Sequence, residues 1–270
     1  MLIWIRGAGD IASGVAFRLW HSGFSVAMTD LPQPTSIRRT ICFSEAIING
    51  TARVEDITGR HAKNAEEARE ILSAGEIAVL ADPDGKEAKK LAPDAVVDAI
   101  LAKRNIGTSK TDAEIVVGVG PGFTAGMDCH AVVETMRGHT LGRAYYAGSA
   151  LPNTGVPGNI GGFTLERILR APRAGVFHGV KAIGDTVSKG EICAYVDGEP
   201  IVSRISGVLR GLLPDGLHVY AGMKSGDVDP RCELSHCYTV SDKALAVGGG
   251  VLEAILHLAA QRGFECKKAD

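Results

Sequence analysis

The sequence predicts an α/β protein in which an N-terminal, doubly wound parallel sheet precedes a small all-β domain. Three observations predict it. Short apolar runs alternate with helical patterns up to residue 119, and a glycine-rich turn follows the first apolar run. In addition, the pattern of residues 175–190 recurs 32 positions later, at residues 207–222. Glycine accounts for 34 of 270 residues, against a usual share of about 7%. Such a chain needs many tight turns or close backbone contacts.

Composition excludes several functional classes. With 29 Lys and Arg against 31 Asp and Glu, the net charge is −2, so no strong field marks a nucleic-acid or membrane-surface binder. No window approaches 18 consecutive apolar residues, and the first apolar run reaches glycine too soon for a signal peptide. We therefore expect a cytoplasmic protein without nucleic-acid or membrane partners, and leave open whether it forms a homo-oligomer.

The first strand is expected over residues 2–5, and the turn after it has the pattern of a phosphate-binding loop. Gly7 permits a tight turn, Gly9 lets the backbone approach a pyrophosphate, and the small Ala12 packs the following helix against the strand. That helix is expected to end at Gly23, a glycine typical of a helix C-terminus.

A second strand is expected over residues 24–30 and ends on Asp30, 21 residues after Gly9. An aspartate there accepts hydrogen bonds from a ribose diol and repels a 2′-phosphate, which favours NAD or an adenosine nucleotide. Asp10 opens the helix, where its carboxylate suits the helix dipole but competes with a bound phosphate. Residues 1–122 thus resemble a Rossmann-like nucleotide-binding domain. The alternative is a nucleotide-free turn that keeps its glycines for the fold.

Further alternation supports the parallel sheet, with helices expected over residues 65–73 and 86–91 and strands over 76–81, 95–101 and 115–119. The ends of such strands line the crevice where these sheets bind ligands. The corresponding residues are Asp82, Lys103, Arg104 and the turn 118–123 with Gly120 and Gly122. The alternative is that they lie in solvated loops.

Residues 123–171 form a glycine-rich connecting region that contains the densest group of titratable side chains. Cys129, His130 and Glu134 are the candidate catalytic residues. On a helix, His130 and Glu134 share a face, which suits a general acid/base pair or a metal site. Cys129 is a candidate nucleophile or soft-atom acceptor if a neighbour lowers its pKa. The alternative is an ordinary amphipathic helix.

No metal site is predicted elsewhere. Cys232, His236 and Cys237 lie close together in the sequence but lack a second pair at zinc-ligand spacing. We expect ordinary buried or surface thiols there.

Residues 172–228 contain the repeat, and each half has strand, turn and strand with a glycine at every corner. Two such halves predict a small flattened barrel that resembles the barrel-sandwich hybrid of biotinyl and lipoyl carrier domains. The turn 196–200, which corresponds to the modification site of those carriers, has no lysine. We therefore expect a structural or ligand-positioning role. Residues 229–270 are expected to pack back on the body through a helix over 251–260.

Four motifs occur together in this chain: Gly-Val-Gly-Pro-Gly-Phe at 118–123, Glu-Thr-x-Arg-Gly-His at 134–139, Asn-Thr-Gly-x-Pro-Gly at 153–158 and Gly-Asp-Val-Asp-Pro-Arg at 226–231. With the N-terminal turn, they resemble the YqeB-type accessory proteins of selenium-dependent molybdenum hydroxylases over essentially the whole chain. The resemblance implies a factor that matures such a hydroxylase and binds a nucleotide or molybdopterin-type cofactor in the Rossmann crevice. Its partners would be the apo-hydroxylase or other cofactor-maturation proteins. It implies no catalytic residues.

Two other functions remain open from the sequence. One is an NAD-dependent oxidoreductase of a small substrate, with Asp30 on the ribose and His130 or Lys103 near the substrate. The other is a non-catalytic module that docks on a partner through residues 172–228.

Overall fold

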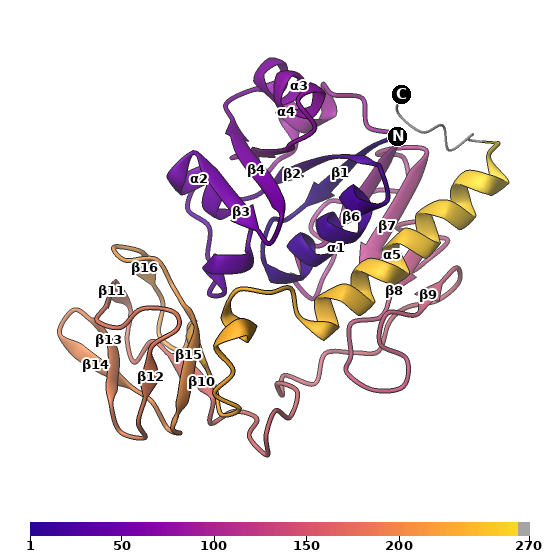
Figure 1. The fold of residues 1–270 in the computed structure, drawn as a ribbon. Coiled ribbons are helices and arrows are strands. Elements are labelled where there is room, and N and C mark those ends of the chain that lie inside the picture. The colour runs from indigo at the N-terminus through magenta and orange to yellow at the C-terminus, as the bar shows by residue number, and fades with distance from the viewer. Residues whose placement is uncertain (264–270) are drawn as a thin grey trace. The chain divides into compact units, whose positions relative to one another are not determined.

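The structure, a computed structural model, describes residues 1–263 and divides into two compact units (Figure 1). Unit 1 comprises Met1–Pro34, Phe43–Thr154 and the chain from Val240 on, and unit 2 comprises Thr35–Cys42 and Gly155–Thr239. The sequence predicts four consecutive regions. Each unit instead combines segments that lie far apart in the chain.

Unit 1 is built on a nine-stranded sheet with the order β3-β4-β5-β2-β1-β6-β7-β8-β9. Its strands are β1 (Leu2–Arg6), β2 (Ser25–Thr29), β3 (Thr51–Val54), β4 (Ile57–Ala62), β5 (Ile77–Leu80), β6 (Ala95–Asp98), β7 (Ile115–Val119), β8 (Ala131–Val133) and β9 (Ala144–Tyr145). Neighbouring strands from β4 to β8 are parallel, whereas β3 and β9 pair antiparallel at the two edges.

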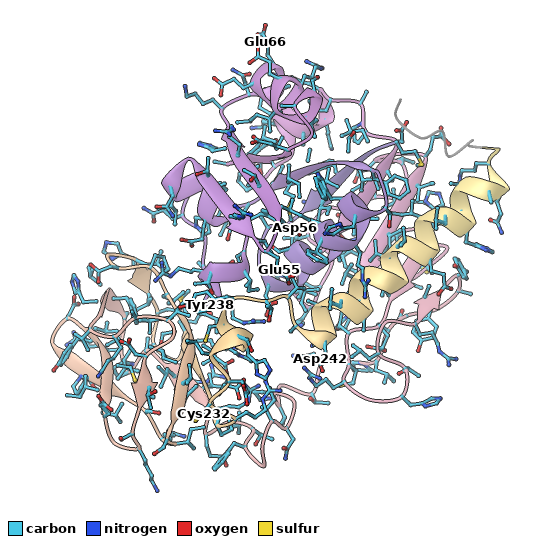
Figure 2. The ribbon with its side chains drawn as sticks, viewed as in Figure 1. Glu55, Asp56, Glu66, Cys232, Tyr238 and Asp242 are labelled. Atoms are coloured by element: carbon cyan, nitrogen blue, oxygen red, sulfur yellow. The ribbon has the colours of Figure 1, made fainter. Side chains whose placement is uncertain are left out.

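The predicted doubly wound, Rossmann-like parallel sheet is therefore wrong, because the observed sheet is mixed. β3 joins β4 through Glu55 and Asp56 (Figure 2), and a two-residue connection can join only antiparallel strands. Parallel strands need a crossover of a dozen or more residues. This hairpin was not predicted from the sequence.

Helices cover the sheet of unit 1. They are α1 (Asp10–His21), α2 (Glu45–Asn49), α3 (Ala65–Ser73), α4 (Lys86–Lys89) and α5 (Asp242–Gln261). The N-cap side chains of α3 and α5 satisfy first-turn amides: Asn64 accepts from the Glu66 and Glu67 amides at α3, and Ser241 accepts from the Ala244 amide at α5.

Helices α1 and α5 lie side by side in front of the strands (Figure 1). They approach closely because glycines face each other: a Cβ on Gly14 would lie 2.5 Å from the Ala244 Cβ, and one on Gly248 would lie 2.6 Å from the Gly14 carbonyl oxygen. Among the described residues, α5 is the one helix whose length and apolar composition would allow a membrane span. Half of its most apolar stretch is buried within unit 1, as in the core helix of a globular domain.

Unit 2 contains two four-stranded sheets, β10-β17-β15-β12 and β14-β13-β11-β16, whose strands all pair antiparallel. The elements are the 3-10 helices η1 (Arg39–Ile41) and η2 (Leu234–Cys237) and the strands β10 (Ile168–Arg170), β11 (Gly175–Gly179), β12 (Thr186–Val187), β13 (Ile192–Val196), β14 (Glu199–Val202), β15 (Gly207–Leu212), β16 (His218–Val219) and β17 (Lys224–Asp229). Their apolar core includes Phe177, Leu209 and Val228.

The predicted biotinyl-like barrel-sandwich hybrid is also wrong, because unit 2 has two separate antiparallel sheets and includes residues 35–42 from the N-terminal half. The repeat positions themselves fall on matching strands. β11 corresponds to β15 and β12 to β16, and β12 pairs with β15 while β16 pairs with β11. Each half of the repeat therefore completes a sheet of the other half.

Candidate functional site

The glycine turn between β1 and α1 is filled by the chain itself. Gly7 has a φ of +99°, and its amide donates to the Thr29 carbonyl at 2.7 Å. A Cβ there would lie 2.9 Å from the Ala99 carbonyl oxygen. Gly9 is extended at the helix start, and Ala12 is buried in α1. The room that a missing side chain leaves at Gly7 thus accommodates the segment after β6.

Asp30 and Asp10 lie beside this turn, as the sequence predicts, but Asp30 holds backbone. Its Oδ2 accepts from the Ala8 amide at 2.8 Å, and its Oδ1 accepts from the Leu31 amide at 2.8 Å. Burial raises the pKa of Asp30, and these two hydrogen bonds counteract that rise. Asp10 is the first residue of α1. The middle amide of the turn is therefore used by Asp30, and the geometry matches a turn that keeps its glycines for the fold.

The other predicted ligand-binding positions at the strand ends also serve the fold. Asp82 accepts from the Lys86, Glu87 and Ala88 amides and so begins α4. A Cβ on Gly120 would lie 2.8 Å from the Thr135 Oγ1, and one on Gly122 would lie 2.6 Å from the Arg104 Cα. Lys103 has a φ of +64° in the loop after β6.

A buried polar network at the ends of β1 and β6 was not predicted. Thr108 donates to the Asp98 Oδ2 at 2.5 Å, Arg6 lies 3.4 Å from the same oxygen, and Arg6 also hydrogen-bonds Thr108. The signal for it was an arginine and an aspartate that each end an apolar strand. Arg6 and Asp98 neutralise each other's charge within this network.

Two of the three candidate catalytic residues are buried in structural roles. Cys129 is fully buried among apolar side chains, and burial raises the pKa of its thiol to about 11. It is therefore protonated and shielded at neutral pH, which does not suit a nucleophile. Glu134 is also fully buried and accepts from the Thr135, Met136 and Leu151 amides.

The predicted helix over residues 131–136 is wrong, because Ala131–Val133 is strand β8. Four residues span about 13 Å along a strand, so His130 and Glu134 lie at its two ends and do not form an acid/base pair. Short runs of β-branched residues are compatible with either structure, and here pairing with β7 selects the strand.

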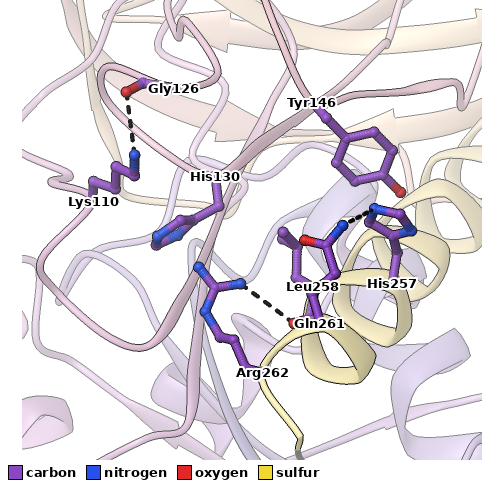
Figure 3. A pocket seen from close by; sticks show the side chains of 8 residues that line it. All are labelled: Lys110, Gly126, His130, Tyr146, His257, Leu258, Gln261 and Arg262. Carbon is purple, nitrogen blue, oxygen red and sulfur yellow. Dashed lines mark hydrogen bonds between the residues drawn. The ribbon is translucent and has the colours of Figure 1, made fainter.

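His130 is the candidate residue that reaches a pocket (Figure 3). Its backbone amide donates to the Val116 carbonyl at 2.8 Å, and its Nδ1 accepts from the Val116 amide at 3.0 Å. Burial lowers the pKa of His130, and the nearby charges of Arg262 and Lys110 lower it further. The neutral ring therefore carries its proton on Nε2 and acts as a hydrogen-bond donor rather than as a general base.

The pocket has a volume of about 460 Å³. It is lined by Lys110, Gly126, His130, Tyr146, His257, Leu258, Gln261 and Arg262, all in unit 1. Apart from His130, these residues were not predicted, because they come from the loop before β7, the loop between β7 and β8, the end of β9 and the end of α5. The one usable signal was the polar group His257, Gln261 and Arg262 at the end of an otherwise apolar helix.

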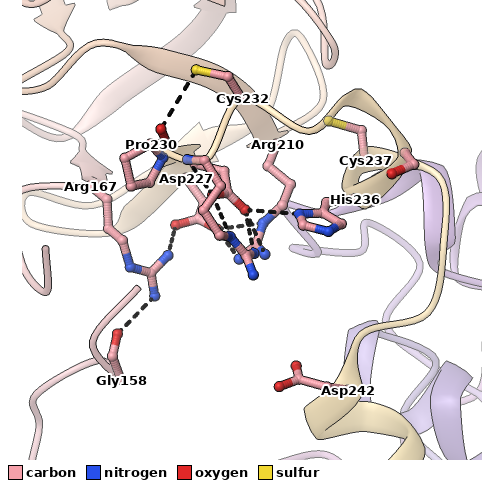
Figure 4. A network of polar contacts seen from close by, with 12 residues as sticks. Gly158, Arg167, Arg210, Asp227, Pro230, Cys232, His236, Cys237 and Asp242 are labelled. Atoms are coloured by element: carbon pink, nitrogen blue, oxygen red, sulfur yellow. Dashed lines mark hydrogen bonds and ion pairs between the residues drawn. The ribbon is translucent and has the colours of Figure 1, made fainter. Parts of the chain in front are cut away.

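Unit 2 contains a ladder of alternating charges along β17 and β15 (Figure 4). Asp227 bridges Arg167 and Arg210, and Asp229 bridges Arg210 and Arg231. Burial alone raises the pKa of Asp229, but hydrogen bonds from Arg231 and the charge of Arg210 bring it down to about 2. Within residues 1–263, no cluster of His, Cys, Asp or Glu forms a metal site.

The comparisons give a relative of unknown activity. No family model matches the chain. It is 50% identical over 257 residues to the uncharacterized protein YqeB of Escherichia coli K12, covering 95% of this chain and 48% of that protein. The chain thus spans about half the length of the curated relative it matches.

The solved structures found are only faintly similar. A succinylglutamate desuccinylase/aspartoacylase of Rhodobacter sphaeroides is 20% identical over 30% of this chain and 25% of that chain, with a TM-score of 0.21. An aspartoacylase family protein of Mesorhizobium loti is 12% identical over 84% of both chains, with a TM-score of 0.26. Similarity this low carries no argument about activity. What is established is that this chain is similar over most of its length to about half of the uncharacterized protein YqeB.

Proposed function

We propose that this chain is a cytoplasmic accessory factor in the maturation of a selenium-dependent molybdenum hydroxylase. In that role it binds the anionic part of a nucleotide or molybdopterin-type cofactor in the pocket around His130. The maturation role rests on the motifs shared with YqeB-type proteins and on the similarity to YqeB. The position of the ligand rests on one observation, the donor character of the pocket.

Three groups near the pocket interior favour an oxyanion. Lys110 and Arg262 both act electrostatically on His130, and the neutral His130 presents an Nε2–H. A phosphate or carboxylate accepts hydrogen bonds and carries the opposite charge, so it complements all three. The glycine turn is less suited to binding an oxyanion. Its Ala8 amide already donates to Asp30, and Ala99 fills the space beside Gly7.

The proposal assigns binding and presentation of a cofactor rather than covalent catalysis. The Cys129 thiol is shielded in the core, and the Glu134 carboxylate is occupied by backbone amides. An NAD-dependent oxidoreductase would need Asp30 for the ribose, and that carboxylate holds Ala8 and Leu31.

The test is complementation of a gene deletion, with the activity of the molybdenum hydroxylase as the readout. We expect the deletion to abolish that activity, the wild-type gene to restore it and Lys110→Met to restore less than a tenth of it. Lys189→Met, at an exposed lysine of unit 2, is the matched control and should restore it fully. Full hydroxylase activity in the deletion strain contradicts the maturation role. Full restoration by Lys110→Met contradicts the pocket.

A further inference from the structure

The pocket of unit 1 has two chemically different ends. Figure 3 shows Lys110 and His130 on one side and the rings of Tyr146 and His257 on the other, with Leu258 and Gln261 between them. One end therefore offers positive charge and hydrogen-bond donors, and the other offers aromatic surface.

The aromatic end is held in place by its neighbours. The ring centroids of Tyr146 and His257 are 4.3 Å apart with an interplanar angle of 40°. The side-chain nitrogen of Gln261 lies 2.9 Å from the His257 Nε2. Burial raises the pKa of Tyr146. The charge of the Glu253 carboxylate and the hydrogen bond that it accepts from the phenol raise it further, so the phenol stays protonated.

Tyr146 nevertheless remains 37% exposed, so part of its ring is available to a ligand. A planar heterocycle stacks on an aromatic side chain without needing a particular hydrogen-bond pattern. An aliphatic sugar phosphate would leave this end of the pocket unused.

The size of the pocket limits the ligand. Small-molecule sites measure roughly 300–1,000 Å³, and a volume of about 460 Å³ lies in the lower part of that range. It suits a single ring system with one phosphate better than a dinucleotide.

We infer that the ligand of this pocket is a planar heterocycle that carries a single phosphate group, such as a pterin phosphate or a purine nucleoside monophosphate. The ring lies against Tyr146 and His257, and the phosphate lies against Lys110, His130 and Arg262. This inference rests on the pocket used in the proposed function and specifies its ligand.

The first experiment dissects the ligand by calorimetric titration of the full chain. GMP and dihydroneopterin phosphate supply ring and phosphate together, guanosine supplies the ring alone, and ribose 5-phosphate supplies the phosphate alone. We expect at least one ring phosphate to bind ten times more tightly than either half. The tighter of the two ring phosphates identifies the ring. Equal affinity for guanosine or ribose 5-phosphate, or no binding of either ring phosphate, overturns the inference.

The second experiment assigns the two ends. Tyr146→Leu should weaken binding of the preferred ring phosphate about tenfold and leave ribose 5-phosphate unchanged. Lys110→Met should weaken both phosphates at least tenfold and leave guanosine unchanged. Tyr220→Leu and Lys189→Met, both at exposed positions of unit 2, are the matched controls. Thermal unfolding of each variant verifies that it folds. If a folded Tyr146→Leu binds the ring phosphate as wild type does, the aromatic end is wrong.

The titrations and the maturation assay test separate claims, so one claim can be contradicted while the other holds. Binding of a ring phosphate by a protein whose deletion leaves the hydroxylase active would keep this inference and remove the proposed function. A required protein that binds no ring phosphate would do the opposite.

Discussion

The Glu134 carboxylate connects two parts of the chain that precede and follow the strand β9. It accepts from the amides of Thr135 at 2.7 Å and Met136 at 2.6 Å, and from that of Leu151, 17 residues further on, at 2.8 Å. Because the carboxylate is not exposed to solvent, it replaces water as the hydrogen-bond acceptor of these three amides. Its neighbours in the sequence suggested acid chemistry, and its bonds indicate a structural acceptor.

Replacing Glu134 should therefore cost stability. Glu134→Gln turns one acceptor oxygen into an NH₂ group that faces backbone donors, and we expect a loss of about 2–3 kcal/mol in the free energy of unfolding. Urea denaturation measures it. Glu199→Gln, at an exposed position on β14, is the control and should stay within about 0.5 kcal/mol of wild type. A loss no larger at Glu134 than at Glu199 would show that the three amides find other partners.

Thiol reactivity is a second test at this scale. Cys42, Cys129, Cys193 and Cys237 are buried, whereas Cys232 is exposed (Figure 2). In a Cys266→Ser background, which removes the one cysteine outside the described residues, we expect a single thiol to react rapidly with DTNB in the native protein and five in denaturant. Burial slows the reaction of the others and raises the pKa of Cys129 and Cys193 to about 11. Rapid labelling of Cys129, located by peptide mapping, would contradict its burial.

Helix α5 shows how packing changes an element that local preference predicts differently. The sequence predicts a helix only from residue 251, because Gly248, Gly249 and Gly250 disfavour one. In the structure α5 runs through all three. Gly248 and Gly250 face the backbone of Gly14 and Gly142 so closely that a side chain would not fit. The close packing of Gly248 against α1 and of Gly250 against the Gly142 backbone compensates for the weak helix propensity of this segment.

This arrangement gives a matched pair of substitutions in one turn of helix. A Cβ at position 248 would lie 2.6 Å from the Gly14 carbonyl oxygen, and Gly248→Ala should cost about 1–3 kcal/mol through overpacking. At Gly249 nothing lies within 4 Å, so Gly249→Ala should add about 0.5–1 kcal/mol through helix propensity. Chemical denaturation compares the two. Equal effects would mean that α5 does not approach α1 at Gly248.

Sequence patterns located most central elements of unit 1. The strands expected at 2–5, 24–30, 76–81, 95–101 and 115–119 and the helix at 65–73 are confirmed to within a few residues. Strand β8 was wrongly predicted as a helix, because its short run of residues is compatible with a helix or a strand and only the pairing with β7 selects the strand. It also missed the antiparallel edges. Of the candidate site only His130 was predicted, since the other pocket residues meet only after α5 has packed.

At the scale of the whole molecule, unit 2 contains a group of buried charged side chains, and unit 1 contains both tryptophans. The ladder of unit 2 buries Arg167, Arg210, Asp227 and Asp229 almost completely. Asp227 is shared by two arginines, so its loss removes the ion pair of Arg167 and leaves Arg210 paired with Asp229 alone. Both tryptophans of the chain, Trp4 and Trp20, belong to unit 1.

These facts allow the stability of each unit to be measured separately. Asp227→Asn should destabilise unit 2 by about 3 kcal/mol or more and lower the midpoint of its unfolding by circular dichroism. Tryptophan fluorescence, which reports on unit 1, should keep its wild-type midpoint. Glu134→Gln should lower the fluorescence midpoint and serves as the reciprocal control. A shift of the fluorescence midpoint by Asp227→Asn would show that the units unfold as one.

The N-terminal segment 35–42 of unit 2 also sets an order of events during synthesis. Arg39 donates to the Leu212 carbonyl, 173 residues later in the chain. At roughly 5–20 residues per second, the ribosome needs about 9–35 s to deliver that partner. Unit 1 likewise waits for α5, which pairs with α1. Neither unit can complete its packing until these later segments have been synthesised, so the apolar surface that they cover stays exposed during that interval.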